Sequence, residues 1–158
     1  MKVSVQKRLY NLLKDSGKTL SAAESCTGGQ ISHLITTVPG SSNYYLGSVT
    51  SYAAEVKIKV LGVKEESIRD YGLVSSQVAA EMSEGVRKIT GSTYSVATTG
   101  LAGPGGDDWG NPEGTVWIGV STPEKTVTFC RHFKGSRTEN IRHFAYAALK
   151  ILADEIEK

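Results

Sequence analysis

The sequence predicts a single α/β domain in which helices cover both faces of a mixed, mostly parallel sheet. Segments with apolar residues at helical spacing alternate along the chain with short strand-like segments, which is typical of this fold class. Near the C-terminus, two strand-like segments are separated by only four residues, which indicates one antiparallel hairpin. We therefore expect residues 1–158 to form one three-layer α/β/α domain without an internal repeat or linker.

The first half of the chain alternates between helices and strands. Val5, Leu9 and either Leu12 or Leu13 recur at helical spacing, and Gly17 is placed for a left-handed C-terminal cap. The segments that follow are a strand at 19–23, a helix at 28–35, a loop at 39–42, a strand at 45–51 and a helix at 53–60.

The second half begins with a helix whose N-cap is Ser75 or Ser76. The apolar face of this helix comprises Val78, Met82, Val86 and Ile89. A strand is predicted at 94–99, and the hairpin strands are predicted at 115–121 and 126–133.

The last helix has the clearest signals. Ser136 and Glu139 form a capping-box pattern at its start. Its apolar stripe comprises Ile141, Ala145, Ala148, Leu152 and Ile156.

The composition excludes several classes of protein. The chain has 18 basic and 16 acidic residues, and this evenly spread net charge of +2 argues against nucleic-acid or membrane partners. No segment resembles a signal peptide or a membrane span. Two cysteines form no disulfide framework, so we expect a cytoplasmic protein, and no residue spacing matches a metal site.

The first candidate site is the segment 23–29, Ala-Glu-Ser-Cys-Thr-Gly-Gly, where a strand turns into a helix. Backbone N–H groups from Thr27 through Gly28 to Gly29 are expected to be free, and such groups bind a phosphate, a carboxylate or a reaction oxyanion. Ser25 is then placed to attack a carbonyl group. The alternative is that Ser25 or Thr27 merely caps the helix.

The second candidate is Lys57, which follows Tyr52 at the end of a predicted strand. Burial lowers the pKa of a lysine, which can then serve as the base for a serine nucleophile. The alternative is that Lys57 and Lys59 are solvated and that Tyr52 is an amphipathic core residue.

Three further features have two interpretations each. Arg137, in the first turn of the last helix, suits a phosphate but is equally expected as an exposed residue without a partner. Cys26 could replace Ser25 as the nucleophile if a histidine lay close to it. Asp107 and Asp108 could bind a cation, but adjacent carboxylates in a glycine-rich loop are more often solvated.

The loop at 100–114 holds six of the 17 glycines and two of the four prolines, which is typical of a functional or mobile segment.

These same segments resemble the CinA C-terminal domain family, the nicotinamide-nucleotide amidohydrolases also called PncC. The resemblance covers nearly the whole chain in order. Its motifs are 23–29, Pro-Gly-Ser-Ser at 39–42, Tyr52-x4-Lys57, Leu-Gly-Val at 61–63, Gly-Leu-Val-Ser at 72–75, Thr-Gly-Leu-Ala-Gly-Pro-Gly-Gly at 99–106, Pro-Glu-Gly-Thr-Val at 112–116 and Phe133-x3-Arg137-x4-Arg142.

The resemblance implies an enzyme that converts nicotinamide mononucleotide and water into nicotinate mononucleotide and ammonia without a cofactor. It also implies a homodimer with a three-layer α/β/α fold. The positions that match the family's functional residues are Ser25, Ser42, Tyr52, Lys57 and Arg137. The larger N-terminal domain often fused to this family, with its second activity, is expected to be absent.

The expected mechanism combines the resemblance with the candidate residues. Ser25 attacks the carboxamide, Lys57 takes its proton, and the N–H groups of residues 27–29 hold the oxyanion. Tyr52 and Ser42 complete a hydrogen-bond chain to Lys57. Arg137 binds the 5′-phosphate, and Gly103 belongs to the substrate site.

Two positions depart from the family pattern. Ala54 replaces a usual asparagine, and Ser136 replaces an aspartate that is an equally good N-cap. The loss of the asparagine motivates an alternative, a non-catalytic module that binds pyridine nucleotides. A third possibility is an amidase that uses the Cys26 thiol.

Overall fold

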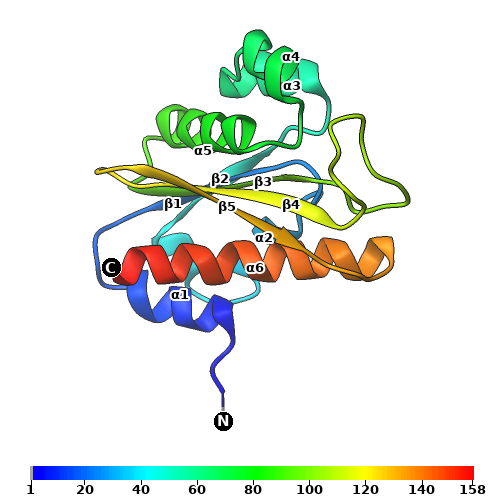
Figure 1. Cartoon of the computed structure of the whole chain (residues 1–158). Coiled ribbons are helices and arrows are strands. Elements are labelled where there is room, and N and C mark those ends of the chain that lie inside the picture. The colour runs from blue at the N-terminus through cyan, green and yellow to red at the C-terminus, as the bar shows by residue number, and fades with distance from the viewer. Residues whose placement is uncertain (1) are drawn as a thin grey trace.

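The computed structural model describes residues 2–158 as three layers, with one sheet between two layers of helices (Figure 1). The strands are β1 (Leu20–Glu24), β2 (Tyr45–Thr50), β3 (Tyr94–Gly100), β4 (Thr115–Ser121) and β5 (Thr126–His132), in the order β2-β1-β3-β4-β5. β1 pairs in parallel with β2 and β3, whereas β4 pairs antiparallel with β3 and β5. All strands except β4 therefore point the same way, which confirms the mixed, mostly parallel sheet with one hairpin.

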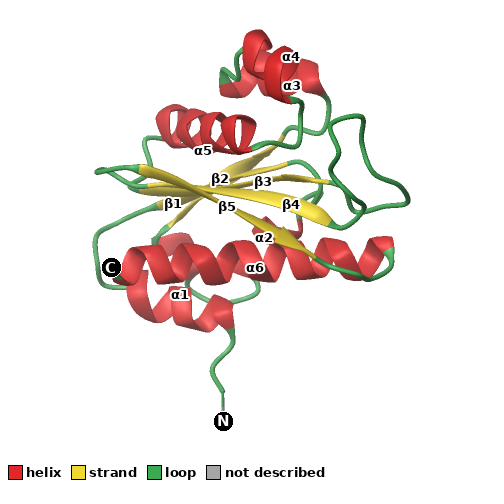
Figure 2. Ribbon diagram, viewed as in Figure 1, coloured by secondary structure: helices red, strands yellow, loops and turns green. Residues whose placement is uncertain are grey.

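Helices lie on both sides of the sheet (Figure 2). The helices on one face are α1 (Val5–Leu13), α2 (Gln30–Thr36) and α6 (Arg137–Glu157). Those on the other face are α3 (Ala54–Leu61), α4 (Glu65–Tyr71) and α5 (Ser76–Thr90), and a short 3₁₀ helix, η1 (Ser41–Asn43), precedes β2. On this second side α3 and α4 pack against α5, which covers the strands. α4 is not predicted from the sequence, because its seven residues contain no apolar periodicity.

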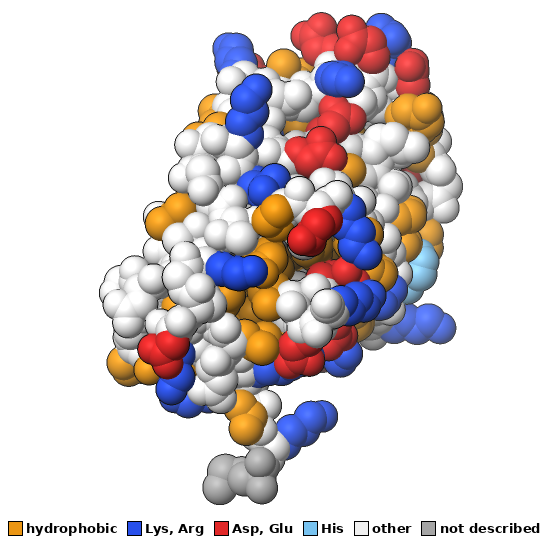
Figure 3. Space-filling model, turned by 90° about the vertical axis from the view of Figure 1, so that its left-hand side faces the viewer, with side chains coloured by type: hydrophobic (Ala, Val, Ile, Leu, Met, Phe, Trp, Pro, Cys, Tyr) orange, Lys and Arg blue, Asp and Glu red, His pale blue; other side chains and the backbone are white. Residues whose placement is uncertain are grey.

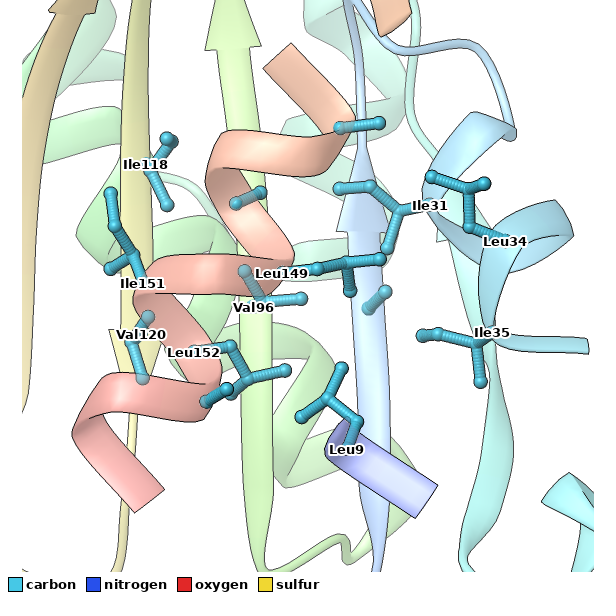
Figure 4. Close-up of a cluster of buried hydrophobic side chains, with 14 of the residues drawn as sticks. Leu9, Ile31, Leu34, Ile35, Val96, Ile118, Val120, Leu149, Ile151 and Leu152 are labelled. Carbon is cyan, nitrogen blue, oxygen red and sulfur yellow. The ribbon is translucent and has the colours of Figure 1, made fainter. Parts of the chain in front are cut away.

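The larger core lies between the sheet and the layer of α1, α2 and α6. Figure 4 shows side chains from these three helices directed toward the strands, with Leu149 and Leu152 of α6 near the centre. Of the predicted α6 stripe, Ala145, Ala148 and Leu152 are fully buried, and the two outer members are partly buried. The predicted capping box of α6 is present, with both of its hydrogen bonds formed.

A smaller core lies beneath α5. Val78, Met82 and Val86 are buried there as predicted, and Ser75 caps the helix by accepting a hydrogen bond from the Val78 N–H. Ile89 is an exception, since it is 54% exposed. It lies in the last turn of α5, next to the helix end at Thr90. Gly85 permits the close approach of α3, because a Cβ there would overlap the Leu61 carbonyl oxygen.

The topology brings three chain segments to one edge of the sheet. β1, β2 and β3 are parallel neighbours, so the residues after Glu24, Thr50 and Gly100 meet at the edge formed by their carboxyl ends. Ligand sites of open α/β sheets form at this edge.

The surface carries a mixture of charges. On the face shown in Figure 3, basic and acidic side chains are interspersed, as the near balance of the composition predicts. Within residues 2–158, no helix has the length and apolar character needed to cross a membrane.

Candidate active site

A pocket of about 520 Å³ opens at this edge of the sheet. Ser25 and Lys57 line it together with residues 99–109, which include most of the glycine-rich loop. Ile68, Leu73 and the Trp109 side chain give it an apolar wall. The loop therefore contributes to the same pocket as the predicted nucleophile and base.

Lys57 and Ser25 are in direct contact. Lys57 Nζ lies 2.8 Å from Ser25 Oγ, 2.6 Å from the carbonyl oxygen of Ser51 and 3.1 Å from that of Tyr52. A neutral amine has two N–H groups and one lone pair. When the two carbonyl groups accept the N–H groups, the lone pair faces the Ser25 hydroxyl. This arrangement allows Lys57 to accept the serine proton.

The environment of Lys57 favours its neutral form. Its side chain is on the inward face of α3 and is 1% exposed. Burial lowers its pKa from the usual 10.5 to about 8. At pH 7 about a tenth of the molecules then hold a neutral Lys57. The interpretation of Lys57 as a solvated charge is wrong, whereas Lys59 is indeed solvated and pairs with Glu55 on the surface.

The turn after β1 differs from its expected form, because Glu24 occupies the first N–H groups of α2. The Glu24 carboxylate accepts hydrogen bonds from the N–H groups of Gly29 (3.2 Å), Ile31 (2.9 Å) and Ser32 (3.0 Å). The N–H of Gly28 donates to the Ser25 carbonyl oxygen at 3.1 Å. The expectation that Gly28 and Gly29 offer free donors is therefore wrong.

The backbone N–H groups that remain free precede Gly28 in the chain. Within residues 2–158, the N–H groups of Cys26 and Thr27 donate to no oxygen atom. Thr27 Oγ1 donates to Glu24 at 2.6 Å and lies 2.9 Å from Thr98 Oγ1. Helix α2 begins after Gly29 and has no side-chain cap from Ser25 or Thr27, so the simple capping interpretation is also wrong.

Glu24 is a residue that the sequence interpretation missed. It is fully buried at the end of β1. The other residues of β1 are small or apolar, so the sequence of this strand suggests no role for a charged side chain. The available signal was an acidic residue close before a Gly-Gly helix start, where a negative charge complements the helix dipole.

Cys26 lacks the surroundings of a nucleophile. Burial raises the pKa of its thiol to about 12. Among the described residues, no histidine forms a hydrogen bond with it, and the one Cys–His contact in residues 2–158 joins Cys130 to His132. The geometry favours Ser25 over Cys26.

Tyr52 and Arg137 form a second cluster at the pocket. The Tyr52 side chain is 66% exposed, so it is not a core residue, and its hydroxyl accepts a hydrogen bond from Arg137 at 3.2 Å. Only the backbone carbonyl of Tyr52 contacts Lys57, so the expected chain through the phenol is not formed. Arg137 also donates to the carbonyl oxygen of Gly103. The interpretation of Arg137 as a residue without a partner is therefore wrong, and Arg137 links the glycine-rich loop to Tyr52.

The glycine-rich loop is anchored at several points. Asn140 of α6 donates to the Ala102 carbonyl oxygen at 2.9 Å. Gly103 has a φ of 110°, and a Cβ there would overlap Glu113 Oε1, so this position needs glycine. The Asp107 carboxylate accepts hydrogen bonds within the loop from Asn111 and from the N–H of Trp109. No group of three potential metal ligands occurs in residues 2–158.

Ser42 does not join these residues. It is exposed in η1, is absent from the pocket lining, and has no hydrogen bond to Lys57. The cause is topological. η1 precedes β2, whereas Lys57 follows it, and the six residues of β2 span about 20 Å. In the single chain, the expected link from Ser42 to Lys57 is therefore wrong.

Comparisons with known proteins identify a family with sequences and folds similar to those of this chain. The family model described as CinA C-terminal domain matches residues 2–156. A "CinA-like protein" of Salinibacter ruber is 46% identical over 94% of this chain, and one of Thermotoga neapolitana is 41% identical over 95%. This chain spans only 36% of the length of each of these two relatives.

Solved structures show the same fold. The competence damage-inducible protein A of Klebsiella pneumoniae superposes with a TM-score of 0.94 at 29% identity, covering 97% of this chain and 95% of that one. The competence/damage inducible protein CihA of Agrobacterium tumefaciens superposes with a TM-score of 0.89 at 29% identity over the whole of both chains.

Proposed function

This chain belongs to the CinA C-terminal domain family, and on that premise we propose that it is a nicotinamide-nucleotide amidohydrolase. The reaction would convert nicotinamide mononucleotide and water into nicotinate mononucleotide and ammonia. The observation that carries the proposal is the 2.8 Å contact between Lys57 Nζ and Ser25 Oγ at the pocket. A serine beside a buried lysine suits acyl transfer from an amide.

In the first step, Ser25 Oγ forms a bond to the carboxamide carbon while its proton passes to the lone pair of Lys57. The C–N bond then breaks, and Lys57 returns the proton to the leaving nitrogen, which departs as ammonia. The carbonyl groups of Ser51 and Tyr52 hold Lys57 in place throughout. The product of this step is an acyl ester of Ser25.

The oxyanion is assigned to the free N–H groups of Cys26 and Thr27. In comparable sites, one such donor is worth about 3–4 kcal/mol in the transition state. In the second step, water attacks the ester carbon and Lys57 takes a proton from it. Ser25 leaves with that proton, and the acid product carries a carboxylate. In these steps Ser25 and Lys57 supply the reacting side chains, and the backbone groups of residues 26, 27, 51 and 52 hold the oxyanion and the lysine.

The shape of the pocket supports a flat ring with an anionic group attached. Ile68, Leu73 and Trp109 form an apolar wall for a pyridine ring. Arg137 lines the same pocket and supplies a guanidinium for the 5′-phosphate. The proposal also includes a cytoplasmic homodimer, which sizing of the purified protein tests in part.

The main alternative is a module that binds pyridine nucleotides without turning them over, motivated by Ala54. Lys57 is held by two backbone carbonyl groups and by Ser25, so its position requires no side chain from residue 54. This observation favours the enzyme over the binding module.

The test is ammonia release from nicotinamide mononucleotide by the wild type, Ser25→Ala and Cys26→Ala. We expect release by the wild type and Cys26→Ala but not by Ser25→Ala. Binding of the nucleotide without ammonia release would support the binding module. Loss of activity in Cys26→Ala alone would support the thiol amidase.

A further inference from the structure

Glu24 is a buried charged residue to which the proposed mechanism assigns no role. It immediately precedes Ser25, and its side chain is completely shielded from solvent. Its carboxylate is surrounded by donors, since three backbone N–H groups and the hydroxyl of Thr27 donate to it. These four donors use the hydrogen-bonding capacity of the carboxylate within the turn itself.

These hydrogen bonds tie both ends of the nucleophile turn together. Glu24 ends β1, and its partners at Thr27, Ile31 and Ser32 lie after the turn. Ser25 and Cys26 lie between these fixed points. The side chain of Glu24 therefore holds Ser25 Oγ at Lys57 and leaves the N–H groups of Cys26 and Thr27 free for the oxyanion.

We propose that Glu24 is a positioning residue that holds the Ser25 turn in its reactive geometry. This inference rests on the proposed function, in which Ser25 is the nucleophile and the N–H groups of Cys26 and Thr27 hold the oxyanion.

The test compares Glu24→Gln, which has nearly the same shape without the charge, with Glu155→Gln as control. Glu155 is a buried carboxylate near the other end of α6, far from the pocket. We expect kcat of Glu24→Gln to fall at least about tenfold while KM changes less than about threefold, as for lost transition-state geometry. Glu155→Gln should change neither quantity.

A serine-directed fluorophosphonate, read by intact mass, separates this inference from the proposed function. If the wild type releases no ammonia but its Ser25 is labelled, the proposed function fails. The positioning role then still requires slower labelling of Glu24→Gln.

A second variant keeps the inference testable if Glu24→Gln does not fold. Thr27→Val removes the 2.6 Å hydrogen bond to Glu24 but retains the Thr27 N–H, so kcat and the rate of Ser25 labelling should both fall. Unchanged kcat and labelling in both variants would overturn the positioning role.

Discussion

Lys57 Nζ lies 2.8 Å from Ser25 Oγ, although the two residues are 32 positions apart in the sequence. The parallel pairing of β1 with β2 explains the contact, because Glu24 and Thr50 are register partners and both strands end at the same edge. Ser25 follows β1 directly, and Lys57 lies in the first turns of α3 after β2. The contact therefore follows from the order of the strands, and its chemistry follows from the burial of Lys57.

The first prediction concerns Lys57 itself. Lys57→Met removes the amine but keeps the length and apolar stem of the side chain, so the protein should fold. We expect turnover at pH 7 to fall by about 10²–10⁴-fold, the range typical of a lost general base. Ammonia release from nicotinamide mononucleotide measures it. Lys59→Met is the matched control and should have little effect, and an essential Lys59 with a dispensable Lys57 would contradict the assignment.

The second prediction is the pH dependence of activity. A base must be neutral, and the Lys57 pKa is lowered by burial to about 8. We expect kcat/KM to rise about tenfold per pH unit between pH 6 and 7.5 and to level off above pH 8. Initial rates in buffers of constant ionic strength measure this profile. A rate that is flat from pH 6 to pH 9 would be incompatible with Lys57 as the base.

The third prediction concerns stability. Between pH 8 and 10.5 the unfolded chain keeps a proton on Lys57, whereas the folded protein loses it. The free energy of unfolding should therefore rise with pH in this window, and burial of Lys57 costs stability below it. The lowered pKa corresponds to about 3 kcal/mol. Urea unfolding of the wild type and Lys57→Met at pH 7 and pH 10.5 isolates this contribution, and a difference between the two proteins that stays constant would contradict it.

Much of the fold could be predicted because its elements depend on local patterns. The capping box at Ser136 and the apolar face around Met82 are readable from spacing alone, since each reports on one helix. Helix α4 could not be found in this way, because it is short and holds a single buried residue, Ser67.

The site was predictable in its residue types but not in its connections. Ser25 and Lys57 stand out as a possible nucleophile and base, yet their contact depends on strand order. The role of Glu24 depends on where its side chain turns after β1, which no spacing reveals. Ser42 illustrates the opposite error, because similarity of motif places it in the site while the fold holds it at the far end of β2.

The fourth prediction concerns the loop from Gly100 to Gly114. Its residues line the pocket, and its hydrogen bonds to α6 are few. Binding of nicotinate mononucleotide should slow hydrogen exchange of its amides at least about tenfold at saturation, because ligand binding opposes local opening. Peptides from α1, on the other face of the sheet, are the control and should not change. Equal exchange of the loop with and without ligand would remove it from the site.

The fifth prediction separates recognition of the phosphate from bond breaking. Arg137 contacts Tyr52 and Gly103 at the pocket but does not contact Ser25 or Lys57. We expect Arg137→Ala to raise KM for nicotinamide mononucleotide about ten- to hundredfold, the value of a lost charge-assisted hydrogen bond. Activity on the dephosphorylated riboside should change little. Some loss of kcat is compatible with this role, because remote binding energy can be used in the transition state.

The decisive quantity is the ratio of kcat/KM for the nucleotide to that for the riboside. Arg142→Ala is the matched control, since Arg142 lies on the same helix, is exposed and does not line the pocket. Tyr52→Phe removes the hydroxyl that accepts from Arg137, so it should lower the ratio less than Arg137→Ala does. If Arg137→Ala leaves the ratio at its wild-type value while Arg142→Ala lowers it, the phosphate is bound by Arg142 and the assignment of the phosphate to Arg137 is wrong.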